Sequence, residues 1–399
     1  MNAKTRIITM LLQGSNVPTI QGPDKLTQVS YKVIQNLAEL AEKCAILARQ
    51  PWLAVDTEFE RVRTYYPRLC LVQVACPELV ACICPISTRN LTPLVEVLLD
   101  RHILKIMHAA RQDLEVLLPV CGSIPGPVFD TQVAAALVGE NAQVSYQSLV
   151  SDLLGAQLDK AHTRADWCKR PLTEDLIQYA IEDVVHLGAL YETLSRQLAD
   201  QGRMQWLKED CAELDRRELY QSDPEQAYVK LSRGHSLPIT QQHALKALAN
   251  WRERTAQEMD LPRNWVASDA NLMDIVASAP HGVPDLTNIE GLRREFSKRH
   301  GKEVAAILEE CASQNPRSRV WDTPERLTRE QKVLREKLMD VLRTRARELN
   351  IAVPVLGTRK DVDTLVRGGK HNALLRGWRF QVVGESLRRM MARKQVPEW

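Results

Sequence analysis

Short apolar strands alternate with amphipathic helices over residues 31–200, and this alternation constrains the fold more than any other feature. Apolar runs bounded by turn residues predict strands, and apolar residues at helical spacing predict helices. The expected strands are 52–55, 70–75, 79–83 and 104–107, and the expected helices are 36–47, 91–99, 112–120, 131–138 and 173–201. Such alternation predicts an α/β layered domain.

Beyond about residue 203 the apolar spacing is helical only, which predicts an all-α part. Apolar positions repeat there at an offset of 90 residues, for example from Leu248 to Leu338 and from Ile275 to Leu365. This repetition predicts two copies of a small helical module. The expected divisions are an N-terminal extension at 1–28, the α/β domain at 29–220, a linker at 221–238, and helical modules at 239–316 and 325–399.

Charge is distributed unevenly along the chain. Residues 281–399 hold 25 Lys and Arg against 16 Asp and Glu, whereas the first 280 residues hold 28 against 34. A basic C-terminal part suits phosphate groups, although solvated helix faces also explain it. No apolar run approaches the ~20 residues of a membrane span. Nine cysteines, an odd number without a CxxC pair, favour reduced thiols and a cytoplasmic location.

Four carboxylates and one tyrosine occupy positions that an α/β domain can bring together. Asp56 and Glu58 lie two apart on an expected strand, so both side chains point to one face. Tyr179 and Asp183 lie four apart on an expected helix and also share a face. Asp113 lies in the first turn of a helix that follows a strand. Each pair alone is common on protein surfaces, whereas the combination in this order is specific.

Clustered carboxylates repel one another, and divalent metal ions are the usual compensation. Oxygen ligands suit Mg²⁺ or Mn²⁺, and two such ions support the hydrolysis of a phosphodiester. The pattern therefore predicts a site for two divalent metal ions. In such a site Asp183 would complete the metal shell, and Tyr179 could hydrogen-bond the attacking water.

Three segments of the chain resemble the motifs of the tyrosine-type DEDD 3′→5′ exonucleases. They are VDTEFERVRTYYPRLCLVQVA (55–75), HAARQDLEVL (108–117) and YAIEDV (179–184). The run TYYP and the segments FDTQVAAAL (129–137) and LLRGWRFQVVGESL (374–387) are similar to bacterial ribonuclease D. The helical modules resemble HRDC domains, the first copy more clearly than the second. The resemblance covers residues 29–399.

The resemblance implies a ribonuclease H-like domain, with a mixed sheet flanked by helices, followed by two all-α HRDC-like domains. It implies release of nucleoside 5′-monophosphates from the 3′ end of RNA, with transfer RNA precursors that carry 3′ extensions as the substrate. Carried over position by position, it makes Tyr179 the residue that positions the nucleophilic water. The metal-binding residues that it implies are Asp56, Glu58, Asp113 and Asp183. No membrane association is expected, and protein partners stay unknown.

Five further residues lie where they could contact the substrate. Phe59 could stack on a base, Gln73 could bond a ribose, and His108 could touch the terminal nucleotide. A structural role in the core or at the sheet edge explains these three equally well. Trp167 and Arg170 precede the catalytic helix and are expected to contact single-stranded RNA. Arginines that could meet backbone phosphates are Arg61, Arg63 and Arg68.

Two other functions stay open from the residues alone. A 3′→5′ exonuclease acting on DNA would use the same acids, because no residue pattern here reads the 2′-hydroxyl unambiguously. A non-catalytic RNA-binding adaptor would use the basic helical modules. The presence of all five motif residues argues against the adaptor.

Overall fold

The computed structural model describes residues 32–158, 165–280, 282–292, 294–314, 316–321, 326–369 and 372–393, so the predicted extension at 1–28 lies outside the described residues. The chain forms two compact units. Unit 1 contains the chain up to Glu58, Leu69–Asp215 and the chain from Gln331, whereas unit 2 contains Phe59–Arg68 and Arg216–Glu330. Each unit is assembled from separate stretches of sequence. The divisions expected from the sequence were consecutive ranges.

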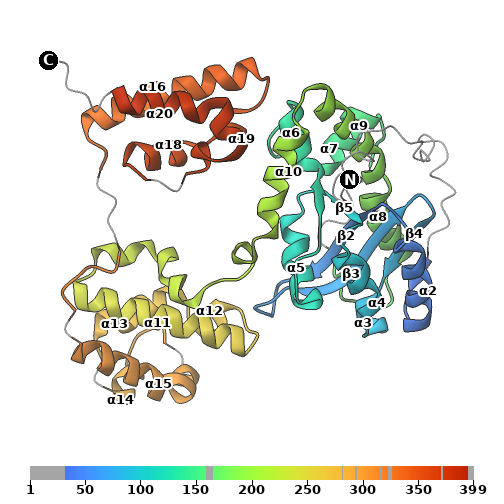
Figure 1. Cartoon of the computed structure of the whole chain (residues 1–399). Coiled ribbons are helices and arrows are strands. Elements are labelled where there is room, and N and C mark those ends of the chain that lie inside the picture. The colour runs from blue at the N-terminus through green and yellow to red at the C-terminus, as the bar shows by residue number, and fades with distance from the viewer. Residues whose placement is uncertain are drawn as a thin grey trace. The chain divides into compact units, whose positions relative to one another are not determined.

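A mixed sheet lies at the centre of unit 1 (Figure 1). Its described strands are β1 (Lys32–Ile34), β2 (Trp52–Glu60), β3 (Arg68–Cys76), β4 (Leu79–Ile83), β5 (Leu104–Met107) and β6 (Val128–Asp130). They lie in the order β1-β4-β3-β2-β5-β6. β4 is antiparallel to β3 and parallel to β1, and β5 is parallel to both β2 and β6. β2 therefore has a neighbour on each side.

Helices pack against this sheet, and the buried apolar residues of both form a common core. The helices are α2 (Leu37–Leu47), α3 (Pro85–Thr88), α4 (Thr92–Leu99), α5 (Arg111–Cys121), α6 (Thr131–Val138), α7 (Tyr146–Leu154), α8 (Glu174–Val185), α9 (Leu187–Asp200) and α10 (Met204–Ala212). A mixed sheet flanked by helices confirms the predicted fold class.

Local sequence signals explain several boundaries. β4, β5 and α6 have the predicted bounds, and the Asp130 carboxylate caps α6, as a capping residue should. Asn36 and Thr173 cap α2 and α8 in the same way. Gly122 ends α5 with φ +68°, a left-handed conformation that favours glycine.

The single helix expected at 173–201 was wrong, because two helices, α8 and α9, meet at His186. No proline marks the break. Just beyond it, Gly188 packs so closely on Trp52 of β2 that a β-carbon would come within 2.7 Å of the indole ring. Packing against the sheet therefore accompanies a break that helical periodicity does not reveal.

Unit 2 is built around a helical module, which we call module 1 (Ile239–Ser313). Its helices are α11 (Ile239–Glu258), α12 (Arg263–Val266), α13 (Asp269–Ser278), α14 (Val283–Leu286) and α15 (Arg294–Ser313). Most of residues 221–238, expected to be a linker, fold into the 3₁₀ helices η4 (Pro224–Lys230) and η5 (Ser232–Ser236). Leu231 between them is buried in the core of module 1.

A second helical module, module 2 (329–393), follows. It contains α16 (Arg329–Glu348), α17 (Val353–Leu356), α18 (Arg359–Val366), η6 (Ala373–Leu375), α19 (Gly377–Arg379), the π-helical η7 (Phe380–Gly384) and α20 (Glu385–Arg393). Its first three helices begin 90 residues after α11, α12 and α13. Ser268 and Thr358 form capping boxes at equivalent positions. The predicted repeat is therefore confirmed for these helices.

Module 2 shares the hydrophobic core of unit 1. The Trp378 ring stacks on Trp206 of α10 with 4.4 Å between ring centres and an interplanar angle of 8°. The Arg379 guanidinium donates to both carboxylate oxygens of Asp210, at 2.5 and 3.0 Å. Apolar stacking and a paired charge therefore join module 2 to α10.

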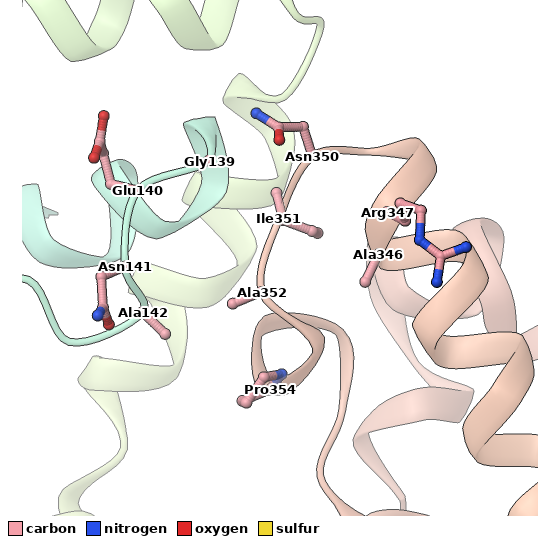
Figure 2. Close-up of a pocket in the computed structure, with 10 residues that line it drawn as sticks. All are labelled: Gly139, Glu140, Asn141, Ala142, Ala346, Arg347, Asn350, Ile351, Ala352 and Pro354. Carbon is pink, nitrogen blue, oxygen red and sulfur yellow. The ribbon is translucent and has the colours of Figure 1, made fainter.

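A cavity of about 500 Å³ lies beside this junction, between the turn at Gly139–Ala142 and the segment Ala346–Pro354 (Figure 2). Gly139 has φ +118°, and a β-carbon on it would come within 2.7 Å of the Asn350 carbonyl oxygen. This close approach requires glycine. None of the predicted site residues lines the cavity.

The cysteines differ from the expectation in one pair. Cys70 of β3 and Cys168 form a disulfide, so the prediction of reduced thiols throughout was wrong for these two residues. Their sequence separation of 98 residues leaves no local signal. The described free cysteines include Cys82 and Cys84, both buried as small apolar side chains. None of the described helices has the length and apolarity of a membrane span.

Candidate active site

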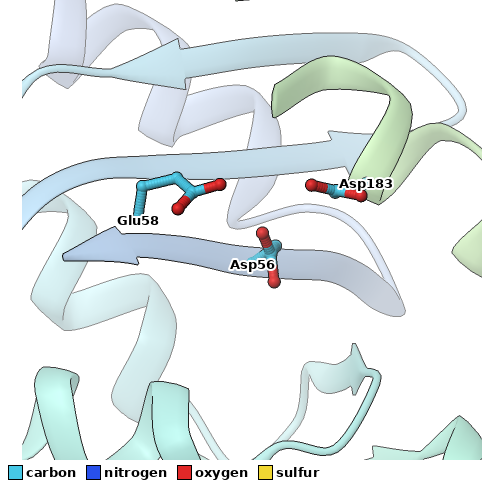
Figure 3. Close-up of side chains that lie close together, drawn as sticks. All are labelled: Asp56, Glu58 and Asp183. Carbon is cyan, nitrogen blue, oxygen red and sulfur yellow. The ribbon is translucent and has the colours of Figure 1, made fainter. Parts of the chain in front are cut away.

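Asp56, Glu58 and Asp183 form the centre of the candidate site (Figure 3). Asp56 and Glu58 alternate with Thr57 along β2, so both carboxylates leave the same face of the strand. Asp183 approaches them from α8. One carboxylate oxygen from each residue lies within 4.8 Å of the others. The structure therefore brings together three of the four predicted carboxylates.

Asp113 lies in the first turn of α5 and is 6% exposed. Its Oδ1 accepts a 2.6 Å hydrogen bond from the Thr57 hydroxyl. The Asp113 charge nevertheless raises the pKa of both Asp56 and Glu58, so it belongs to the same electrostatic cluster. Thr57 lies between Asp56 and Glu58 in the sequence, so this hydrogen bond holds Asp113 beside the group of three carboxylates.

The carboxylates of this cluster have raised pKa values, and burial is the largest cause for each. Burial, followed by the charges of Asp183 and Asp113, raises the pKa of Glu58 to about 8. Burial, followed by Glu182 and Asp113, raises the pKa of Asp183 to about 7. Burial raises the pKa of Asp113 to about 7 although Thr57 opposes the shift, and the pKa of Asp56 is raised as well.

Raised pKa values mean that protons or cations are needed to keep these groups together. The group offers oxygen ligands from partly buried carboxylates, the donor set that Mg²⁺ and Mn²⁺ prefer. Asp56, Glu58 and Asp183 therefore fit a hard divalent cation. Asp113 lies outside this 4.8 Å group.

Tyr179 lies one turn before Asp183 on α8. Burial, followed by the Asp183 and Glu58 charges, raises the pKa of its hydroxyl. The phenol therefore stays protonated at neutral pH and can donate or accept a hydrogen bond, but it is a poor base. The Trp167 ring packs on Tyr179 with 5.9 Å between ring centres.

Three supporting residues were not identified from the sequence. Thr57 bonds Asp113, as described above. The Tyr146 hydroxyl donates to the Glu182 carbonyl oxygen at 3.0 Å, beside Asp183. The Asp130 carboxylate accepts the backbone N–H groups of Ala109 and Ala110 at 3.1 and 2.9 Å, which positions the start of α5. Asp130 also caps α6, and its contacts with Ala109 and Ala110 join β6 to the start of α5.

Two of the predicted substrate contacts, Trp167 and Arg170, lie inside the fold. Trp167 is 5% exposed, which favours support of Tyr179 over stacking on a base. The Arg170 guanidinium donates to the Trp167 carbonyl oxygen at 2.7 Å and to Cys84 Sγ at 3.0 Å. Arg170 thus fixes the segment before α8.

The other three candidates differ in exposure. Gln73 is fully buried in β3, and its side-chain amide has no hydrogen-bond partner among the described residues. His108 lies 2.9 Å from the Thr131 hydroxyl and 3.1 Å from the Val144 carbonyl oxygen, so both ring nitrogens are engaged. Phe59 is half-buried, with the Arg61 guanidinium 6.0 Å from its ring centre. Of these three candidates, Gln73 and His108 fit structural roles best.

Two family models match the chain. A 3′-5′ exonuclease family matches residues 31–199, and the HRDC domain family matches residues 241–308. The HRDC match covers most of α11–α15 of module 1. The assignment of module 2 as a second HRDC domain stays a prediction.

Whole-chain relatives agree with these matches. The chain is 36% identical to "Ribonuclease D" of Granulibacter bethesdensis over 370 residues, covering 89% of this chain and 91% of that protein. It is also 36% identical to "Ribonuclease D" of Pseudomonas paraeruginosa, covering 91% and 98% of the two chains. The crystal structure of Escherichia coli RNase D, an exoribonuclease involved in structured RNA processing, matches with a TM-score of 0.83 at 28% identity, covering 92% of this chain and 99% of that chain.

Proposed function

The chain belongs to the ribonuclease D family of 3′→5′ exoribonucleases, and we propose that Asp56, Glu58, Asp113, Tyr179 and Asp183 carry out its reaction. The observation that supports this assignment is the convergence of three carboxylates from β2 and α8 within 4.8 Å. Four partly buried acids with raised pKa values would destabilise the fold unless a bound cation offset their repulsion. Such groups are typical of functional sites.

Asp56, Glu58 and Asp183 would hold divalent metal ions, with Asp113 completing the set. When bound, two such ions lower the pKa of a water molecule and stabilise the charge on the leaving 3′ oxygen. We propose Mg²⁺ or Mn²⁺, because the ligands are all oxygens.

Tyr179 would orient the attacking water by a hydrogen bond, since its raised pKa keeps the phenol neutral. The water oxygen forms a bond to the terminal phosphorus, and the bond from phosphorus to the 3′ oxygen breaks. A nucleoside 5′-monophosphate leaves, and the 3′ oxygen takes up a proton in place of the one that the water loses, so the shortened RNA ends in a 3′-hydroxyl. The packing of Trp167 on Tyr179 would limit the movement of the phenol.

We further propose that the RNA is a transfer RNA precursor with a 3′ extension, processed in the cytoplasm. This narrower substrate rests on the family and on the basic C-terminal part of the chain. A 5′-labelled precursor and a matched single-stranded DNA should be incubated with Mg²⁺, Mn²⁺ or EDTA. We expect a metal-dependent ladder that shortens from the 3′ end on RNA; equal laddering on DNA would make the broader nuclease the better description.

Replacement of one acid tests the assigned residues. Asp183→Asn keeps the shape of the side chain but removes a charge, and we expect cleavage to fall at least about 1,000-fold. RNA binding, measured by gel shift in Ca²⁺, should survive. Asp175→Asn makes the same change at an exposed position of α8 and should leave cleavage unchanged. Cleavage by Asp183→Asn at the wild-type rate would contradict the assignment.

A further inference from the structure

Residues 59–68 contain the end of β2, the connection 61–67 and the first residue of β3. We call this segment loop 59–68; it belongs to unit 2 together with module 1. Its attachment is built around Tyr65. The Tyr65 hydroxyl donates to the Glu253 carboxylate and accepts hydrogen bonds from Gln257 Nε2 and Arg263 Nη2, both at 3.1 Å. The Arg263 guanidinium also lies 4.9 Å from the centre of the Tyr65 ring. One side chain of the loop therefore engages three residues of module 1.

Backbone groups of the loop complete this attachment. Asp260 Oδ1 accepts the N–H groups of Tyr65 and Tyr66, both at 3.0 Å. Asp260 follows α11 with φ +50°, a left-handed conformation that is unfavourable for most residues with a β-carbon. Glu253 is 2% exposed and paired with Arg263, so the Tyr65 hydroxyl helps to satisfy a buried charge. We call this group the clasp; its members are Tyr65, Glu253, Gln257, Asp260 and Arg263.

Other side chains of the same loop are exposed, and they are aromatic, apolar or cationic. Tyr66 is 44% exposed and Val62 is 66% exposed. Module 1 itself is not basic, because residues 239–316 hold 9 Lys and Arg against 11 Asp and Glu. The loop therefore brings positive charge to a slightly acidic module. Its exposed arginines are Arg61, Arg63 and Arg68.

We propose that loop 59–68 contacts the single-stranded RNA that lies outside the terminal nucleotide, and that module 1 acts on RNA by holding this loop. Single-strand sites combine cations along the phosphate backbone with aromatic rings on which bases stack. Arg63 and Tyr66 supply one group of each kind. Glu58 of the acid cluster precedes Arg61 of the loop by three residues, so chain connectivity keeps the start of the loop near that carboxylate. The inference rests on the exonuclease function proposed above.

A comparison of a short and a long RNA substrate distinguishes a contact with the loop from a role in catalysis. A dinucleotide offers a single phosphodiester, whereas an RNA of about 12 nucleotides fills a site of the usual single-strand size. We expect Tyr66→Ala and Arg63→Gln each to lower kcat/KM on the longer RNA about fivefold to tenfold, mainly through KM, because one stacked base or one phosphate contact is lost. Cleavage of the dinucleotide should be unchanged.

Tyr65→Phe tests the clasp, since it removes the hydroxyl and keeps the ring. We expect about a tenfold loss of kcat/KM on the longer RNA and none on the dinucleotide. Trp265→Ala and Arg299→Gln serve as controls, because they remove an exposed ring and an exposed cation of module 1 outside the loop. Both controls should behave as wild type.

Three results would overturn the inference: wild-type activity of Tyr66→Ala and Arg63→Gln on the longer RNA, equal losses on both substrates, or equal losses in the controls. Binding of the longer RNA in Ca²⁺ supplies an independent readout. The salt slope of log K should fall by about 0.7 in Arg63→Gln. If wild type binds through the loop but cuts neither substrate with any metal, the proposed catalytic function fails and the loop contact stands. If Tyr65→Phe does not fold, Tyr66→Ala and Arg63→Gln still test the contact between the loop and the RNA.

Discussion

Modules 1 and 2 share the order and spacing of their first three helices, yet they attach to the rest of the chain by different chemistry. Module 2 joins the core of unit 1, with Trp378 stacked on Trp206. Module 1 has its own core and holds loop 59–68 mainly through polar groups around Tyr65 and Glu253. The hydrophobic effect does not depend on the orientation of the side chains, so an apolar interface does not rely on any single atom. A polar interface loses stability when one hydrogen-bond partner is removed.

The same corner of each module makes these attachments. Asp260 and Asn350 lie 90 residues apart, after α11 and α16, with φ +50° and +51°. In module 1, Asp260 accepts two N–H groups of the loop. In module 2, Asn350 lies against Gly139, and Arg203 donates to the neighbouring Leu349 carbonyl oxygen at 2.6 Å. The equivalent corner of the two modules thus contacts a different segment in each case.

The two modules also differ in net charge. Residues 325–399 hold 18 Lys and Arg against 9 Asp and Glu, while residues 239–316 hold 9 against 11. The basic character of the C-terminal part therefore belongs mainly to module 2. Because module 1 has no excess of basic residues of its own, an RNA contact in unit 2 is better placed on the arginines of loop 59–68.

The largest expected effect comes from the apolar junction. Trp378 is 1% exposed, and its indole N–H donates to Asp210 at 3.0 Å. Trp378→Ala should cost about 3–5 kcal/mol of the free energy of unfolding and release module 2. Urea unfolding gives the energy, and hydrogen exchange in α16–α20 locates the loss. Trp265→Ala, at a 61% exposed position, should change stability by less than about 0.5 kcal/mol; an equal cost for both would remove the distinction between the junctions.

In metal-free protein, we expect the stability of the two units to depend differently on pH, with a smaller effect than the loss of Trp378. The pKa values of Asp113 and Asp183, about 7, and of Glu58, about 8, lie above their unfolded values. Their stabilising contribution is complete below about pH 4 and is lost as pH rises through 7 to 8. The pKa of Glu253 in unit 2 is lowered by Arg263 and Tyr65 against its burial, so the stabilising contribution of this carboxylate is lost in acid, as pH falls below the ordinary glutamate pKa.

Hydrogen exchange, corrected for the intrinsic pH dependence, measures this difference. In EDTA, moving from pH 5 to pH 8 should reduce protection in β2 and α8 but not in α11. Added Mg²⁺ should restore protection in β2 and α8 at pH 8, because bound cations offset the carboxylate charges. Loss of protection in α11 to the same extent would contradict the assignment of the pH effect to the acid cluster.

The smallest effect is expected at the capping boxes. Ser268→Ala and Thr358→Ala each remove an N-cap side chain, and each should cost about 1 kcal/mol. The exchanges Ser268→Thr and Thr358→Ser keep the hydroxyl and serve as controls. Similar costs, measured by urea unfolding, would show that the modules differ in attachment and not in local helix stability. A cost several times larger at Thr358 would show that the shared core transmits local changes.

Much of the candidate site followed from sequence spacing. Two residues apart on a strand and four apart on a helix are local periodicities, so the shared faces of Asp56 with Glu58 and of Tyr179 with Asp183 needed no tertiary information. Asp113 followed from its place in the first turn of a helix after a strand, and resemblance to a family added the roles of these residues. The convergence of Asp56, Glu58 and Asp183 agrees with that reading.

Contacts between distant segments could not be read in the same way. The Thr57 bond to Asp113 spans 56 residues, and the Asp130 contacts with Ala109 and Ala110 join β6 to the start of α5. The burial of Trp167 is also a tertiary property, because an aromatic residue in a polar stretch has the same sequence signature whether it is buried or exposed.

The sequence by itself determined many of the helices and strands, the 90-residue repeat and the faces that carry the acids, because helix and strand periodicity are local properties. Only the tertiary structure decided that the chain breaks at His186, that Asp113 is held by Thr57, and that loop 59–68 belongs to module 1. These features depend on which surfaces meet. A side chain such as Tyr65 acquires its role only when residues almost 200 positions away, Glu253 and Arg263, come within hydrogen-bonding distance.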